Sequence, residues 1–76
     1  MTTREPPLSA QLPLTLDPGW YPVIYSWNAN EGFFPGAGKW DGAEWAATGP
    51  VSNYWPHRFN SELEAKDFAN TNDPEW

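Results

Sequence analysis

The sequence predicts a small α+β domain in which a three- to four-stranded antiparallel β-meander is followed by one C-terminal helix. Three observations favour this class. Residues 20–27 combine β-branched and aromatic side chains, which is typical of a strand. Residues 39–45 contain an Asp-Gly pair between tryptophans, a strong signal for a tight hairpin. Ser61 and Glu64 have the spacing of a helix capping box.

The two ends of the chain differ in composition from its middle. Residues 1–18 hold four of the nine prolines, which predicts an extended arm that is either disordered or strapped to the domain. Residues 19–70 form the single predicted domain, and the polar residues 71–76 form a frayed tail. A folded part of roughly 50 residues has little apolar surface to bury. Because the chain has no cysteine, no disulfide can supplement that core.

The first predicted strand, residues 20–27, should present two different faces, because successive side chains of a strand point to opposite sides. Pro22 lacks a backbone donor, so the strand either begins at an edge or pairs fully only after residue 22. One face carries Tyr21, Val23, Tyr25 and Trp27, and the other carries Trp20, Pro22, Ile24 and Ser26.

Residues 28–38 are predicted to form an irregular loop, because they contain three glycines and Pro35. Phe33 and Phe34 are adjacent inside this predicted loop, although loops normally run over the surface. The two phenylalanines are therefore either a plug tucked under the loop or a pair displayed for a partner.

The hairpin that follows is centred on Asp41 and Gly42, which suit the two central positions of a type I′ turn, where φ is positive. In this register Trp40 and Ala43 flank the turn directly, and Trp45 lies on a diagonal further along.

Two more elements complete the predicted fold. Residues 51–55 form a short last strand that Pro56 ends. A helix runs from about residue 62 to residue 70 and is too short to be stable alone, so it must dock onto the sheet, through Leu63 and Phe68.

Aromatic residues crowd the middle of the chain, since all except Phe68 and Trp76 lie between residues 20 and 59. Large rings are one of the few ways to build a core in so small a domain, which predicts that most tryptophans are buried. Their number exceeds what one thin core can hide, so at least one ring is expected at the surface. The alternative is an exposed aromatic platform for sugar rings, peptide or protein.

Composition argues against several classes of partner. The formal net charge is -6 and the four Lys and Arg residues are scattered, which argues against direct contact with nucleic acid. No signal-like apolar run follows Met1, and no stretch approaches the ~20 apolar residues that a membrane helix needs. The sequence therefore predicts a cytoplasmic protein that does not contact membranes.

No residue pattern points to catalysis, a metal or a cofactor. His57 is the only histidine and lies in a predicted turn, so a structural role is expected. Glu31, Asp41 and Glu44 could in principle supply the pair of carboxylates that a glycoside hydrolase uses. A domain of this size is too small to enclose a cleft for a sugar, and Asp41 is already needed for the turn. The expectation is a non-enzymatic protein.

The hairpin and the last strand resemble known sequences. The motif Trp40-Asp41-Gly42, followed by Trp45 and then by Tyr54-Trp55-Pro56, is similar to small uncharacterised domains that phages and prophages encode. The resemblance covers roughly residues 20–56. This chain departs from the pattern by placing Pro56 directly after Trp55 and by adding the helix after Ser61. The family has no assigned activity, so the resemblance implies an origin and no site residues.

These observations lead to one main hypothesis, that this small acidic accessory protein acts by binding another protein through an aromatic surface. Three alternatives remain: a module for carbohydrate or peptide, an acidic DNA mimic that inhibits a nucleic-acid-binding protein, and a homodimer. In the main hypothesis aromatic rings anchor the partner, and an acidic rim favours a basic one. Phe33→Ala or Phe34→Ala should then abolish binding without unfolding the domain. The predicted binding residues are Phe33, Phe34, an exposed Trp40 or Trp45, Glu31 and Glu44.

Overall fold

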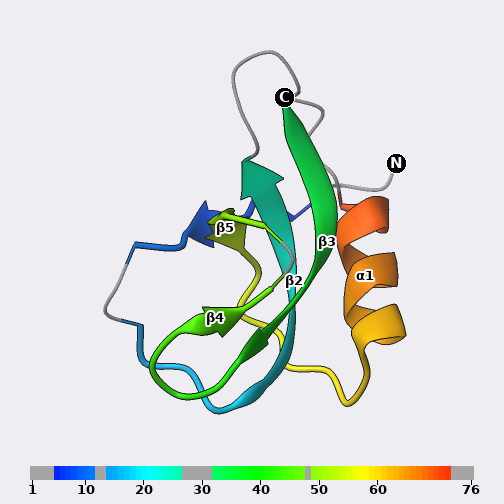
Figure 1. The fold of residues 1–76 in the computed structure, drawn as a ribbon. Coiled ribbons are helices and arrows are strands. Elements are labelled where there is room, and N and C mark those ends of the chain that lie inside the picture. The colour runs from blue at the N-terminus through cyan, green and yellow to red at the C-terminus, as the bar shows by residue number, and fades with distance from the viewer. Residues whose placement is uncertain (1–4, 12–13, 27–31, 48, 73–76) are drawn as a thin grey trace.

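The computed structural model describes residues 5–11, 14–26, 32–47 and 49–72. These residues form one five-stranded antiparallel sheet with a single helix on one of its faces (Figure 1). The predicted α+β class is confirmed, with more strands than the three or four expected. The elements are β1 (Leu8–Ser9), β2 (Gly19–Ser26), β3 (Phe33–Trp40), β4 (Trp45–Ala46), β5 (Val51–Tyr54) and α1 (Glu62–Thr71).

The order of the strands in the sheet is β1-β5-β2-β3-β4. Strands β2, β3 and β4 follow one another as a meander, as predicted. Strand β5 then returns to the free side of β2, which gives these four strands the order of a Greek key. Strand β1 adds to the outer side of β5, with Leu8 opposite Tyr54. Residues 8–9 of the arm are therefore part of the sheet.

The two faces predicted for the first strand are confirmed for the described residues of β2. Val23 and Tyr25 pack with Ala10 and Tyr54 on one face of the sheet. Ile24 packs with Trp55 and Ala69 on the other face, which α1 covers. Trp27 lies outside the described residues.

Pro22 lies in the centre of the sheet, because β2 has β5 on one side and β3 on the other. The Trp55 N–H donates to the Pro22 carbonyl at 3.0 Å, but proline has no N–H to donate in return, and the Trp55 carbonyl accepts from the His57 N–H instead. Full pairing with β5 starts at Val23, as predicted, while the suggestion of an edge strand is wrong.

The prediction of an irregular loop is wrong for residues 33–38, which belong to β3. Glycine is a poor strand residue in general, but here neighbouring rings occupy the space that a side chain would fill. A Cβ atom added at Gly36 would lie 2.4 Å from Cε2 of Tyr25, and one at Gly38 would lie 3.1 Å from Cε3 of Trp45. The strand therefore depends on side chains that are distant in sequence.

The turn between β3 and β4 is shifted by one residue from the prediction. Trp40 lies directly opposite Trp45, and the Asp41 N–H donates to the Glu44 carbonyl. The Asp41 carboxylate accepts the N–H groups of Ala43 and Glu44, each at 2.8 Å, so Asp41 precedes the turn instead of occupying its centre. These two bonds hold the pKa of Asp41 below its usual value.

Helix α1 begins where the capping motif predicted. Ser61 is the N-cap, and its hydroxyl accepts the Glu64 N–H at 3.2 Å. Among the described residues the reciprocal bond from the Glu64 carboxylate is not formed. The helix docks through Ala65, Ala69 and Phe68, whereas Leu63 is 68% exposed, so the prediction that Leu63 docks is wrong. Leu63 lies about 160° around the helix from Ala65, on the side away from the sheet.

We expect Ser61→Ala to lower the free energy of unfolding by about 1 kcal/mol, because the Glu64 N–H would lose its acceptor. Urea denaturation followed by circular dichroism measures this change. Ser9→Ala is the matched control, since Ser9 is exposed, and its change should stay within about 0.5 kcal/mol. Equal losses in both variants would show that the cap contributes nothing specific.

The arm is held to the domain by three buried aromatic side chains. The Trp55 indole N–H donates to the Glu5 carbonyl at 2.7 Å, the Trp40 indole N–H donates to the Leu16 carbonyl at 3.1 Å, and the Tyr21 hydroxyl donates to the Asp17 carbonyl at 2.6 Å. Burying such rings requires a partner for their polar atoms, and the arm supplies that partner.

Within the described residues no helix is long and apolar enough to cross a membrane.

Candidate binding groove at the edge of strand β3

The residues predicted to form the binding surface are not brought together. Phe33 and Phe34 begin β3 and are 41% and 44% exposed, but as neighbours in a strand they point to opposite faces. Trp40 ends the same strand, roughly 23 Å away at 3.3 Å per residue. Glu44 is exposed in the turn beyond it, and Glu31 lies outside the described residues.

The two tryptophans offered as surface anchors have structural roles. Trp40 is 1% exposed, so the prediction that it lies at the surface is wrong. Trp45 is half-buried, with ring centroids 5.0 Å from Trp40, 6.0 Å from Tyr21 and 5.9 Å from Tyr54. The indole N–H of Trp45 is buried, and within the described residues it has no hydrogen-bond partner. The two rings pack together because Trp40 and Trp45 are directly opposite in the paired strands, which places their side chains on the same face of the sheet.

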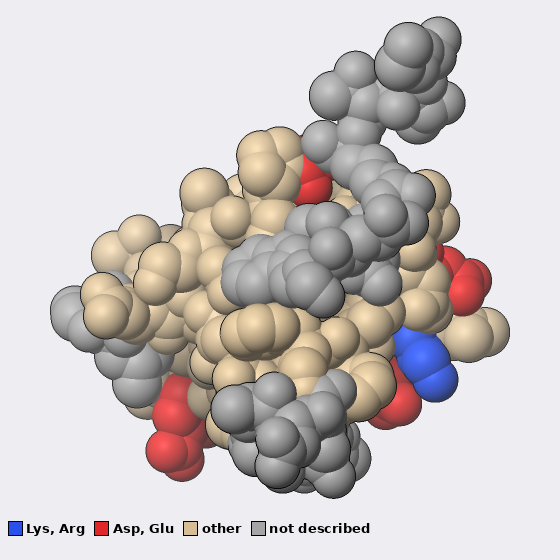
Figure 2. Space-filling model, turned by 90° about the horizontal axis from the view of Figure 1, so that it is seen from above, with Lys and Arg blue, Asp and Glu red and all other residues tan. Residues whose placement is uncertain are grey.

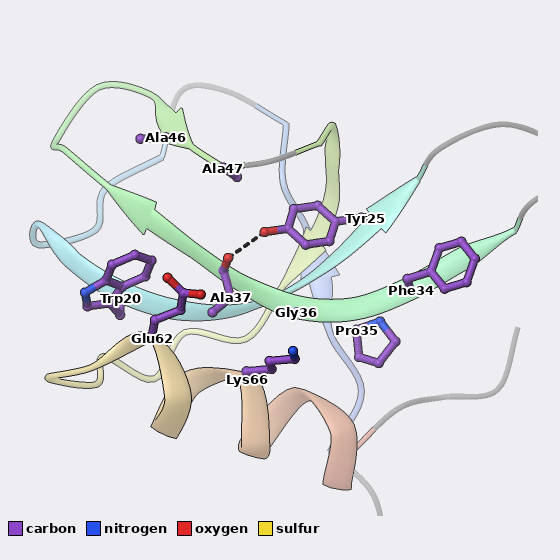
Figure 3. Close-up of a pocket in the computed structure, with 10 residues that line it drawn as sticks. All are labelled: Trp20, Tyr25, Phe34, Pro35, Gly36, Ala37, Ala46, Ala47, Glu62 and Lys66. Atoms are coloured by element: carbon purple, nitrogen blue, oxygen red, sulfur yellow. Dashed lines mark hydrogen bonds between the residues drawn. The ribbon is translucent and has the colours of Figure 1, made fainter.

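A groove of about 680 Å³ runs along the edge of β3 instead (Figure 3). Strand β4 pairs only with Lys39 and Trp40, so in the described part of the chain no strand lies beside residues 33–38 on that side. Helix α1 lines one side of the groove, and Ala46 and Ala47 at the end of β4 line the other. The groove is lined by Trp20, Tyr25, Phe34, Pro35, Gly36, Ala37, Ala46, Ala47, Glu62 and Lys66.

The backbone at this edge is partly protected against pairing. Because the backbone groups of an antiparallel strand alternate between its two neighbours, the bond at Asp41 implies that Ala37 and Pro35 direct theirs away from β2. Pro35 has no N–H at this position. The Tyr25 hydroxyl reaches across Gly36 and donates to the Ala37 carbonyl at 2.5 Å. Such features are typical of edges that avoid indiscriminate strand association.

The groove is lined by charged side chains where α1 borders it and by aromatic rings toward its two ends. Glu62 and Lys66 extend from α1 on one side of β3, and in the described part of the chain neither is held by a hydrogen bond or ion pair. Trp20 and Phe34 lie toward the two ends. Trp20 is opposite Lys39, so the two rings are separated by about five strand residues, or roughly 17 Å. This length suits about five extended residues of a ligand.

Of the predicted residues that the structure describes, only Phe34 lines the groove. Sequence reasoning missed Trp20, Tyr25, Glu62 and Lys66 as site residues. The alternation predicted for β2 places Trp20 and Tyr25 on opposite faces of the sheet. Their position relative to Phe34 depends on β3, most of which the sequence predicts to be a loop. Glu62 and Lys66 are four residues apart on α1, a spacing that a contact within the helix already explains, so the sequence alone does not mark them as site residues.

Other reactive side chains have structural partners. The Nε2 atom of His57 lies 2.6 Å from a carboxylate oxygen of Glu5, and both side chains are nearly half exposed. Within the described ranges no three metal-ligating side chains are grouped. In the view of Figure 2, acidic groups are spread around the molecule and basic groups do not form a patch.

Comparison with known proteins identifies no relative, since no family model, no curated protein and no solved structure matches the chain.

Proposed function

We propose that this chain is a non-enzymatic accessory protein that binds an extended segment of another protein in the groove along β3. The observation that carries the proposal is the outer edge of β3 at residues 34–38, beside which the described part of the chain places no further strand, next to the exposed ring of Phe34. A cleft that lies on both faces of a strand edge matches the shape of a peptide in strand conformation. A phage or prophage origin belongs to the same proposal and rests on the Trp-Asp-Gly hairpin and the Tyr-Trp-Pro segment.

Side chains supply most of the recognition in this proposal. Pro35 and the bond from Tyr25 to Ala37 limit the number of backbone hydrogen bonds that a ligand strand can make. An apolar ligand side chain would lie against Phe34 and the ring of Tyr25 above Gly36. On the α1 side Glu62 and Lys66 would contact polar groups of the same segment. Aromatic anchors with a charged rim are the usual arrangement of protein interfaces.

We expect Phe34→Ala to remove the partner while Phe33→Ala retains it. The two side chains are equally exposed, but only Phe34 lines the groove. Truncating an aromatic anchor typically costs 2 kcal/mol or more of binding free energy, or about thirtyfold in Kd. The measurement is a tagged pull-down from a host lysate with the wild type and both variants, read by mass spectrometry.

Circular dichroism must show both variants folded for this comparison to count. A protein retained by Phe33→Ala and lost with Phe34→Ala supports the groove. The groove is contradicted if the captured protein is lost with both variants, if both variants retain it, or if only Phe33→Ala loses it.

A second variant tests whether the ligand pairs with the backbone of β3. The Ala37 N–H faces the groove, so Ala37→Pro should keep the fold, as Pro35 does two residues earlier. The proline removes one donor and places its ring where the ligand strand would lie. We expect the Kd of the captured partner to rise at least tenfold, measured by calorimetry. An unchanged Kd would show that the partner does not pair with β3.

A further inference from the structure

A second pocket lies on the other flank of α1, away from the edge of β3. It measures about 490 Å³ and is lined by Phe59, Glu64, Asp67, Phe68, Thr71 and Asn72. The α1 residues are spaced three or four apart, so they share one side of the helix. Glu62 and Lys66 belong to the groove instead, so α1 separates two sites with different linings.

The floor of this pocket is aromatic. The rings of Phe59 and Phe68 have centroids 5.6 Å apart and are tilted by 49°, and both half-buried residues line the pocket. Phe68 is fixed from behind by Trp55 at 5.9 Å and by His57 at 5.3 Å. The polar edge of His57 is directed at Glu5. The rings are thus held in position by the core.

The rim of the pocket is negative. Among the described residues, Glu64 and Asp67 are the two charged side chains that line it, and no Lys or Arg does so. The Glu64 carboxylate is not used in the capping box, since among the described residues only the Ser61 half of that motif is formed. The amide of Asn72 is already occupied, accepting from the Glu5 N–H and donating to the Phe68 carbonyl. Two carboxylates and two aromatic rings that line the same pocket therefore remain for a ligand.

We propose that this pocket binds the guanidinium group of an arginine side chain from a partner protein. A planar cation can stack on the faces of Phe59 and Phe68 while its N–H groups donate to Glu64 and Asp67. Arginine suits this combination better than lysine, because its charge is planar and its donors form a fork. The formal net charge of -6 adds a long-range attraction for a basic segment.

The test is a titration of the full chain with N-acetyl-arginine amide, followed by two-dimensional NMR of the backbone amides. N-acetyl-citrulline amide, which has nearly the same shape without the charge, is the control ligand. We expect saturable shifts at residue 59 and residues 64–72 with arginine, and at least tenfold weaker binding with citrulline. Equal responses to both ligands, or no saturable response, would overturn the proposal.

Variants separate this site from the groove. Glu64→Gln with Asp67→Asn should weaken arginine binding at least fivefold. Glu64→Gln alone should also weaken it, whereas Glu62→Gln, the matched single change on the groove side of α1, should leave it unchanged. Equal losses would indicate general electrostatic attraction and contradict a specific pocket. Arg4 directly precedes Glu5, so the titration is repeated with Arg4→Gln to remove a competing cation. Phe34→Ala should not alter arginine binding, which keeps this test independent of the groove.

Discussion

Trp55→Ala is expected to remove much of the stability of the domain. Trp55 is 0% exposed and packs with Ile24 and Ala69 between the sheet and α1. Removing a buried tryptophan typically lowers the free energy of unfolding by about 3–5 kcal/mol, because the apolar surface of the ring is no longer buried and a cavity is left in the core. A chain of 76 residues has a free energy of unfolding of roughly 4–11 kcal/mol, so a loss of this size takes much of the total. Thermal unfolding followed by circular dichroism measures the effect.

A pair of smaller changes separates the packing of Trp55 from its hydrogen bond. Trp55→Phe removes the donor to the Glu5 carbonyl, whereas Trp45→Phe removes a donor that is buried without a partner in the described residues. We expect Trp55→Phe to lower the free energy of unfolding by about 2 kcal/mol and Trp45→Phe by less than about 1 kcal/mol. Similar losses would mean that the bond to the arm contributes little.

Gly36→Ala is expected to destabilise the protein by about 1–3 kcal/mol, the usual cost of overpacking. The new Cβ would lie 2.4 Å from Cε2 of Tyr25, and the Tyr25 side chain is 7% exposed, so its ring has little room to move away. Displacing the ring would also break its bond to the Ala37 carbonyl. Urea denaturation gives the change in the free energy of unfolding.

A double-mutant cycle identifies the cause of that loss. Tyr25→Ala removes the ring that a Cβ at residue 36 would meet, so adding Gly36→Ala to it should cost almost nothing. If Gly36→Ala costs the same with and without Tyr25, the contact with the ring is not the reason for the glycine. The same ring also lines the groove, so these variants link the stability of β3 to the shape of the proposed binding site.

The position of α1 determines how the two proposed sites relate to each other. One flank of the helix closes the groove, and the other flank carries the carboxylates of the arginine pocket. A basic partner that crosses α1 could contact both sites, whereas separate ligands would occupy them independently. Measuring the Kd of the captured partner with Glu64→Gln and Asp67→Asn distinguishes these cases.

The candidate site could be predicted only in part. The exposed phenylalanines were recognised because adjacent large rings between glycines are unusual in any segment. Their division between opposite faces depends on β3 being a strand, which the composition of residues 32–38 does not indicate. The groove residues on α1 could not be assigned without knowing which face of the helix meets the sheet. The small side chains of Ala65 and Ala69 decided that orientation by allowing a close approach.

The sequence by itself determined the elements whose signals are local. Alternation along β2, the cap at Ser61 and the α+β class all follow from neighbouring residues and were predicted with nearly the correct boundaries. The tertiary structure alone decided the glycine-rich strand β3 and the attachment of the arm. Each depends on partners far along the chain: Tyr25 above Gly36, and arm carbonyls for Trp40 and Trp55. Local propensity cannot contain such information, because these segments are stabilised by the rings and donors that surround them after folding.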